Sequence, residues 1–274
     1  MNFFFKPTGL KPYPIEEEEW FFGLDEVLPL KNTFKRLKNG ELESSTEPIK
    51  CAYSVLEEEI RNIPHLAERF EECLDETLEQ LICHMAIHLL AFYYWDKVKQ
   101  ICRFDNTLFE NLTKDTMPCD ISTRVISEKL PFDSFFIDNP ITDKNGDVYR
   151  GVYVTRFTSR NRQSLLLFFM RNVPKRDFRY IYIPLDLGEK TLEEVAEINS
   201  IPIEEYYGVP GNDRNDCFYL AKKALNLIAY LCSEDIDIER ITLKVQNGKK
   251  HIKVKKALVG KEYGRNIRDI KAME

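Results

Sequence analysis

Few residues of the 274-residue sequence combine types and spacing that could support chemistry, and the first pair is His84 and His88. They lie four positions apart beside Cys83 in the segment CHMAIH. On a helix this spacing places both imidazoles on one face, as in helical zinc sites. The segment lacks the glutamate of the metalloprotease motif, and no third ligand follows at a suitable spacing. We therefore interpret both histidines as buried or half-buried core residues, and we predict no metal ion and no other cofactor.

Four aspartates flank predicted strands and define an alternative function, a metal-dependent nuclease or RNA-processing enzyme. Clustered carboxylates on a sheet can bind Mg²⁺ and promote phosphodiester cleavage. Asp also occurs at strand ends and turns for local reasons, and no nuclease spacing motif connects these four. A phosphate-binding glycine loop and a serine elbow are both missing from the sequence. We expect a protein without intrinsic catalysis and keep the enzyme as the alternative. The aspartates are Asp133, Asp138, Asp147 and Asp186.

A C-terminal hairpin is predicted by the segments ITLKVQ and KKHIKV on either side of Asn247-Gly248. Asn-Gly is a strong signal for a two-residue turn between antiparallel strands. A turn at these two residues pairs Leu243 with Ile252 and Ile241 with Val254. All four apolar side chains then share one face, and the opposite face is basic.

Basic side chains gather on and beside this hairpin. Such a group could neutralise phosphates and support salt-sensitive RNA binding even in an acidic protein. Its alternative role is to protect an exposed edge strand from aggregation. The candidate partner- or RNA-binding residues are Lys244, Lys249, Lys250, Lys253, Lys255, Lys256, Arg265 and Arg268.

These residues must be positioned by a run of predicted strands between residues 130 and 187. The strands are LPFDSFFID, VYRGVYVTRF, SLLLFFMRNV and FRYIYIPLD, and Asn145-Gly146 marks a turn before the second. The segment SLLLFFM is apolar throughout, so we expect both faces of that strand to be covered.

Two long helices are predicted to pack on this sheet. The first spans residues 62–102, with Asn62 as its N-cap, and the second spans residues 216–232. Between them, Thr191 and Glu194 form the pattern of a capping box. The fold class is therefore α+β: a mainly antiparallel β-sheet packed with two long helices, and a C-terminal β-hairpin. We expect residues 1–60 to be an irregular N-terminal arm and residues 61–274 to be a single α+β domain.

The composition fits a cytoplasmic protein. The net charge is −6, so bulk electrostatics do not favour a polyanion, and RNA contact would need a local basic patch. Seven cysteines occur without a Cys-x-x-Cys pair, which fits a reducing compartment. The N-terminus is too broken by proline for a signal peptide. No apolar run approaches roughly 18 residues, so we expect no membrane contact.

Five segments, in order and at similar spacing, resemble a type V-A anti-CRISPR family. The segments are LLAFYYWDKVKQICRFD at 89–105, LPFDSFFID at 130–138, YIYIPLDLGEKTLEEVAE at 180–197, KALNLIAYLCSEDIDI at 223–238 and VGKEYGRNIR at 259–268. The first 60 residues show no correspondence. The chain ends at Glu274, where the known family member continues into a long basic tail.

The resemblance implies a protein of a mobile element, such as a phage or plasmid, that acts in the cytoplasm of a bacterial host. It implies a binding protein that recognises a CRISPR effector nuclease or its nascent chain and lowers its expression, with RNA or the ribosome as further candidate partners. A mobile-element accessory protein with an unrelated partner remains a second alternative beside the enzyme.

Overall fold

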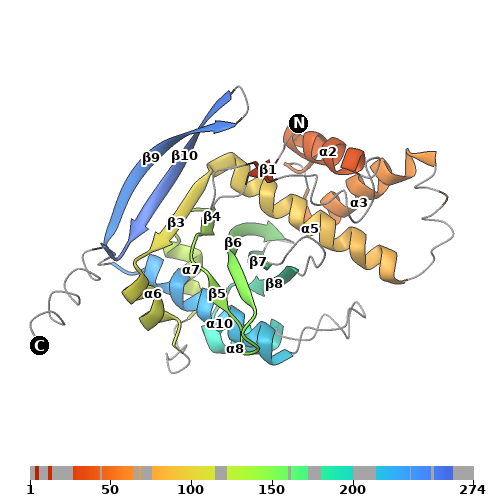
Figure 1. The fold of residues 1–274 in the computed structure, drawn as a ribbon. Coiled ribbons are helices and arrows are strands. Elements are labelled where there is room, and N and C mark those ends of the chain that lie inside the picture. The colour runs from red at the N-terminus through yellow and green to blue at the C-terminus, as the bar shows by residue number, and fades with distance from the viewer. Residues whose placement is uncertain are drawn as a thin grey trace, which may run out of the picture.

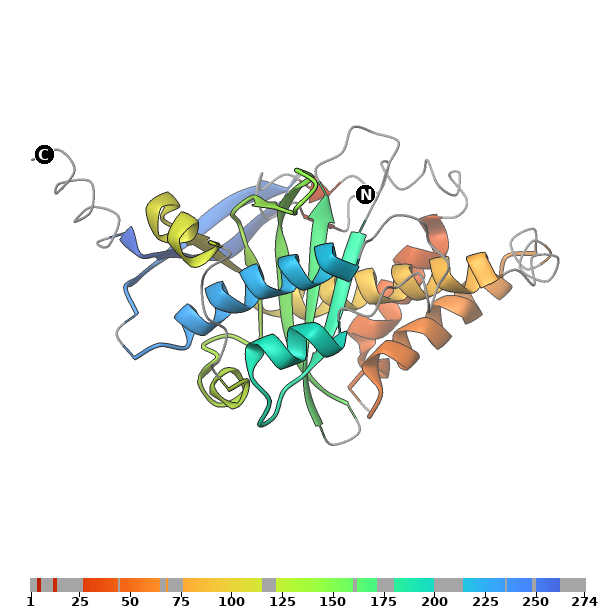
Figure 2. The same ribbon diagram turned by 90° about the horizontal axis from the view of Figure 1, so that it is seen from below.

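The computed structural model of this chain describes a sheet between two layers of helices (Figure 1, Figure 2). The fold class predicted from the sequence, α+β with a mainly antiparallel sheet, is confirmed. The described residues are 4–5, 12–13, 27–43, 45–64, 68, 76–114, 122–159, 162–171, 180–199, 214–234, 236–247 and 250–261.

The main sheet has eight strands in the described residues, in the order β8-β7-β6-β4-β3-β10-β9, with β5 paired to β6. The strands are β3 (Gln100–Phe104), β4 (Ser134–Ile137), β5 (Ile141–Thr142), β6 (Val148–Ser159), β7 (Arg162–Arg171), β8 (Tyr180–Asp186), β9 (Ile238–Asn247) and β10 (Lys250–Val259). Most pairs are antiparallel, but β3 runs parallel to both β4 and β10. A separate antiparallel pair joins β1 (Phe4–Phe5) to β2 (Pro12–Tyr13).

Helices cover both faces of the sheet. On one face lie α10 (Arg214–Leu231) and α8 (Leu192–Asn199), seen in front of the strands in Figure 2, with α6 (Asn106–Leu112) and α7 (Arg124–Lys129). On the other lies α5 (Glu76–Val98), on which α2 (Val27–Arg36), η3 (Leu37–Glu41) and α3 (Pro48–Arg61) pack. None of the helices described is long and apolar enough to cross a membrane.

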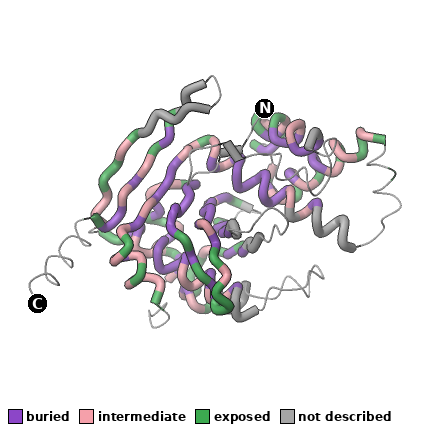
Figure 3. The backbone as a smooth tube through the Cα atoms, viewed as in Figure 1, coloured by how far each residue is buried: buried purple, intermediate pink, exposed green. Residues whose placement is uncertain are grey.

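The apolar strand β7 shows why the sheet needs both layers. Leu165 and Leu167 belong to the core under α10, whereas Leu166 and Phe168 belong to the core under α5. All four are at most 1% exposed, because successive side chains of a strand point to opposite faces. The prediction that both faces of this strand are covered is confirmed, and Figure 3 shows the buried residues along these strands.

Two further predictions, for helices α8 and α10, are confirmed. The amide of Glu194 donates to Thr191 Oγ1 at 3.2 Å, and the amide of Thr191 donates to Glu194 Oε2 at 2.7 Å, which is a reciprocal capping box at the start of α8. On α10, the apolar positions recur at three- and four-residue steps, so they form one buried stripe. These residues are Leu220, Ala224, Leu225, Ile228 and Leu231.

The predicted helix over residues 62–102 is wrong at its C-terminal end and in the role of Asn62. Asn62 caps the C-terminus of α3, where its amide donates to Glu58 O at 3.0 Å. The described helix α5 begins at Glu76, and the chain turns at Lys99, whose φ of 52° is left-handed, into strand β3. Short apolar runs fit a helix and a buried strand equally well, so the sequence pattern did not show this change.

The expectation of irregular structure in residues 1–60 is wrong for two helices. Helix α2 lies within this range, and α3 begins in it and ends at Arg61. Apolar residues of α3, among them Ala52, Val55 and Leu56, are buried in the same core as α5. Arg36 at the end of α2 joins these helices through Glu41 at 2.7 Å, Glu58 at 2.8 Å and Glu59 at 3.0 Å.

The predicted hairpin exists, but its register is wrong by two residues. Leu243 pairs with Val254, and Ile241 pairs with Lys256. The paired ends are Asn247 and Lys250, so Asn247 lies in β9 instead of in the turn, and the two residues between them lie outside the described residues. A shift of two residues keeps each side chain on its face, since the period of a strand is two.

Candidate functional site

The hairpin of β9 and β10 extends beyond the rest of the sheet (Figure 1). Strand β3 pairs only with Lys255–Val259 of β10, so residues 250–254 continue past it. At the base, Ala257 and Val259 are buried and hold the hairpin on the core. The result is a two-stranded ribbon with a fixed base and an extended outer part.

Three of the predicted binding residues have described side chains, and all three lie on β10. Lys253 and Lys255 are exposed on one face, and Lys256 is half-buried on the other, so the basic residues do not share a single face. By its backbone, Lys244 pairs with Lys253 across the hairpin.

The remaining predicted residues are only partly described or not described. Lys244 and Lys250 lie in β9 and β10 by their backbones. Lys249, Arg265 and Arg268 lie outside the described residues.

The two edges of the sheet differ in their capacity to accept another strand. Strand β8 contains Pro184, which has no amide hydrogen to donate. Strand β9 has ten residues without a proline, and on its outer side no strand pairs with it among the described residues. The β9 edge is therefore the one that could bind an extended peptide through its main chain.

The four strand-end aspartates do not form one site. Asp133 precedes β4 and pairs with Arg156, whose Nε donates to Asp133 Oδ1 at 3.1 Å, whereas Asp138 follows β4. Asp186 accepts from Ser164 Oγ at 3.1 Å at the Asp133 end of the sheet. Among the described residues, no group of three or more His, Cys, Asp or Glu could hold a metal ion.

Asp138 is nearly buried between the strands at the base of the hairpin. Burial raises the pKa of its carboxyl, and the positive charge of Arg103 acts against this rise. Arg103 Nη1 lies 3.9 Å from Asp138 Oδ1 and also donates to the backbone oxygen of Asp138. The next residue, Asn139, bonds the backbone of Phe104 in both directions, at 2.8 and 3.1 Å. These contacts give both residues a structural role in joining β3 to the end of β4.

His88 is a core residue, as interpreted from the sequence. Its ring stacks on Phe168 at 4.9 Å between centroids and lies 4.6 Å from Phe92. Burial lowers the pKa of His88 to about 3, because the charged imidazolium loses its hydration in this apolar cluster. The side chain of His84 lies outside the described residues.

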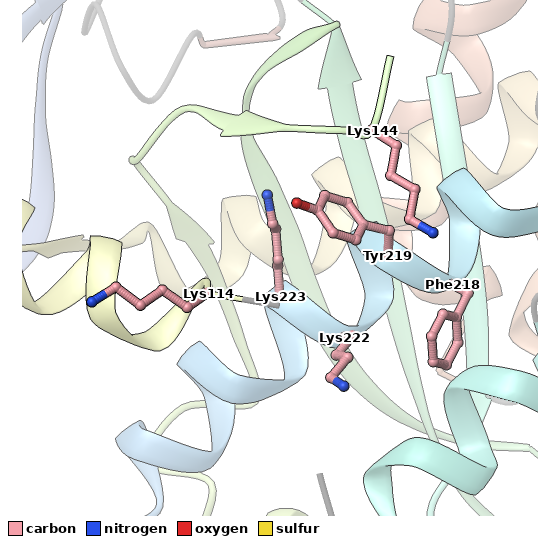
Figure 4. Close-up of a pocket in the computed structure, with 6 residues that line it drawn as sticks. All are labelled: Lys114, Lys144, Phe218, Tyr219, Lys222 and Lys223. Carbon is pink, nitrogen blue, oxygen red and sulfur yellow. The ribbon is translucent and has the colours of Figure 1, made fainter. Parts of the chain in front are cut away.

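A cavity that the sequence analysis missed lies beside α10 (Figure 4). Its volume is about 190 Å³. The lining residues come from the turn after α6, the turn between β5 and β6, and the middle of α10, which are far apart in the sequence. They are Lys114, Lys144, Phe218, Tyr219, Lys222 and Lys223. Only the adjacent Lys222-Lys223 pair, inside an amphipathic helix, gave a local signal.

Comparison with known proteins finds a matching family model and similar solved structures. The model of the AcrVA2-like family, described as the anti-CRISPR type V subtype A2 family, matches residues 102–274. A solved structure described as the crystal structure of AcrVA2 is similar, with a TM-score of 0.56 and 14% identity, over 89% of this chain and 83% of that chain. No curated protein matches the sequence. At this identity the structural likeness shows the fold alone. Because the structural match covers 89% of this chain, it must also include part of residues 1–60.

Proposed function

Since this chain belongs to the anti-CRISPR type V subtype A2 family, we propose that it recognises a polypeptide segment of a CRISPR effector nuclease and lowers the expression of that nuclease. The family match is the observation that carries this function. It covers residues 102–274, which include every strand of the main sheet except the first two residues of β3. We further propose that the protein comes from a mobile element and acts in the cytoplasm of the bacterial host.

Strand addition at β9 is the recognition mode that the fold supports best. A nascent or unfolded segment presents a free main chain, and an open edge binds a main chain with little dependence on sequence. Specificity would come from side chains beside the edge, among them Arg240 and Thr242, which are exposed. Arg240 is held over the ring of Phe132 at 5.6 Å, so its guanidinium is positioned before a partner arrives.

The basic residues of β10 support a contact with an acidic segment, RNA or the ribosome beside the bound peptide. Lys253 and Lys255 are exposed on the same face of the hairpin. A strand bound at the outer edge of β9 would lie two strand spacings of about 4.8 Å each from β10. The lysines of β10 and acidic groups beside the bound strand can approach each other across β9.

Co-expression with a type V-A effector nuclease tests the function. We expect the wild-type protein to lower both the effector polypeptide and its mRNA, and Lys253→Gln with Lys255→Gln to weaken the effect. The matched control replaces two exposed lysines of α2 and α3, Lys35→Gln with Lys50→Gln, and should retain the full effect. An effector level that is unchanged by the wild-type protein would contradict the proposal.

A further inference from the structure

We propose that the face of the sheet on the α5 side binds a phosphate group between Arg103, Arg150 and Lys256. These residues belong to β3, β6 and β10, and they lie around the carboxylate of Asp138, which directly follows β4. The four strands are consecutive in the sheet, in the order β6-β4-β3-β10. The site does not include the outer edge of β9, so the proposed effector recognition would stand if this site failed.

The alternation of side chains places the groups of β3, β4 and β10 on one face. Ile101 of β3 is buried in the core under α5, and Arg103 lies two positions after it. Phe136 of β4 is buried in the same core, and Asp138 lies two positions after it. Lys256 of β10 pairs with Ile101 across the ladder. Because every second residue of a strand faces the same side, all three ionisable side chains lie on the α5 side of the sheet.

The bulge in β6 adds a second guanidinium to this group. The pairing of β6 with β7 passes from Tyr149 directly to Gly151, so Arg150 is the extra residue. Tyr149 and Val152 both belong to the core under α10, although residues three positions apart face opposite sides of a regular strand. A bulge redirects side chains in this way. The positive charge of Arg150 acts on the carboxyl of Asp138.

Three positive charges therefore face one negative charge. Burial raises the pKa of the Asp138 carboxyl, and the positive charges of Arg103, Lys256 and Arg150 act against this rise. Asp138 is 9% exposed, and the three basic residues are half-buried. Partial burial reduces the screening of these charges by water. The group keeps an excess of two positive charges within a protein whose net charge is −6.

A neighbouring carboxylate on the same face does not cancel this excess. Glu239 of β9 lies opposite Leu258, which is two positions after Lys256 and so shares its face. Glu239 Oε2 accepts from Lys261 Nζ at 2.6 Å, so these two charges balance each other.

The basic side chains keep donors for a ligand. Arg103 Nη1 lies 3.9 Å from Asp138 Oδ1 and also donates to the backbone oxygen of Asp138. Both contacts fix the guanidinium through Nη1, so Nε and Nη2 stay available among the described residues. The side chains of Arg150 and Lys256 form no hydrogen bond or ion pair with another residue in the described part of the chain. A fixed guanidinium also loses little entropy when a ligand binds.

The charge of the group favours a phosphate over a carboxylate. A phosphate monoester carries a charge of about −1.5 to −2 at pH 7, which balances the excess, whereas a carboxylate supplies one negative charge. Guanidinium groups bind phosphate oxygens through two parallel hydrogen bonds, and an ammonium adds a point charge. Strands β6 and β10 flank β4 and β3, so Arg150 and Lys256 can reach the phosphate from its two sides.

The test is isothermal titration calorimetry of the full chain with inorganic phosphate and with a nucleoside monophosphate. Arg150→Gln with Lys256→Gln should weaken binding by about tenfold for each charged hydrogen bond lost. Lys253→Gln with Lys255→Gln is the matched control, because both lysines are exposed on the opposite face of β10. The control should bind phosphate as the wild type does, even though it is expected to weaken the effect on the effector, so failures of the two proposals are distinguishable.

Asp138→Asn gives a second readout, because it removes the negative charge from the group and should tighten phosphate binding. A loss of binding through misfolding would have the opposite sign. Circular dichroism shows whether each variant retains the fold.

Four results would overturn the site: no binding of either phosphate compound by the wild type, an equal loss in both double variants, weaker binding by folded Asp138→Asn, or acetate binding as tightly as phosphate. Tighter binding of the monophosphate identifies an ester as the ligand, and tighter binding of inorganic phosphate identifies the free ion. Both results support the shared phosphate chemistry.

Discussion

At the scale of single residues, the chain uses its ionisable groups mainly to build the fold. His88 is stacked between aromatic rings, Asp133 pairs with Arg156, and Asp138 is held beside Arg103. Residues that looked chemically capable in the sequence are thus occupied by structural contacts. Lys253 and Lys255 of the hairpin are among the charged groups that the fold presents outward.

Replacing the buried histidine should change the dependence of stability on pH. Burial lowers the pKa of His88 to about 3 in the folded protein, from the ordinary value of about 6.5 in an unfolded chain. The unfolded chain therefore binds a proton first as the pH falls, and the folded state loses up to about 1.4 kcal/mol per pH unit across this window. In His88→Leu this loss disappears. The free energy of unfolding of the variant should therefore rise relative to that of the wild type as the pH falls from 6.5 toward 3.

Urea unfolding of both proteins at several pH values measures this difference. Above about pH 7 the imidazole is neutral in both states, so the difference between the two proteins should no longer vary with pH. Parallel pH profiles below pH 6 would show that His88 is accessible to protons in the folded protein and would contradict its buried assignment.

At the scale of elements, the bulge in β6 explains a glycine in a long strand. The pairing of β6 with β7 shifts between Tyr149 and Gly151, and a Cβ at Gly151 would collide with Ile137 O and the ring of Phe136. A bulge bends the strand and brings another backbone close, so only a residue without a side chain fits here. This contact connects β6 to β4 at the centre of the sheet.

Gly151→Ala should therefore destabilise the protein by about 1–3 kcal/mol, since the neighbours that would have to move are a buried backbone and a buried ring. Gly188→Ala is the matched control, because nothing lies within 4 Å of its Cβ position, and the change should be within about 0.5 kcal/mol. Thermal unfolding of both variants gives the comparison. If Gly151→Ala and Gly188→Ala were equally stable, the added methyl group at Gly151 would fit without a clash, which would contradict this explanation of the glycine.

The elements also show what the sequence could predict. The strands between residues 130 and 187, the capping box at Thr191 and helix α10 were all predicted, because turn residues and three- to four-residue periodicity are local signals. The change from α5 to β3 and the register of the hairpin were not, since they depend on which neighbours each strand meets. Helix α3 had a local signal in Pro48, which lies in its first turn, and the sequence analysis did not use it.

At the scale of the whole molecule, the candidate sites depend on contacts between distant segments. The hairpin lysines were predicted because they are adjacent in sequence, although Lys256 lies on the opposite face to Lys253 and Lys255. The α10 cavity was missed because Lys114, Lys144 and Lys223 come together only through the fold. A mixed sheet with helices on both faces leaves its edges and helix surfaces for binding, and β9 is the edge without proline.

Hydrogen exchange of the purified protein with overlapping peptides of a type V-A effector nuclease tests the central claim most directly. Binding by strand addition should slow exchange of the β9 amides for at least one peptide, while the amides of β8, where Pro184 interrupts the donors, stay unchanged. Protection that is confined to elements other than β9, or no protection by any peptide, would contradict recognition of the effector polypeptide at this edge.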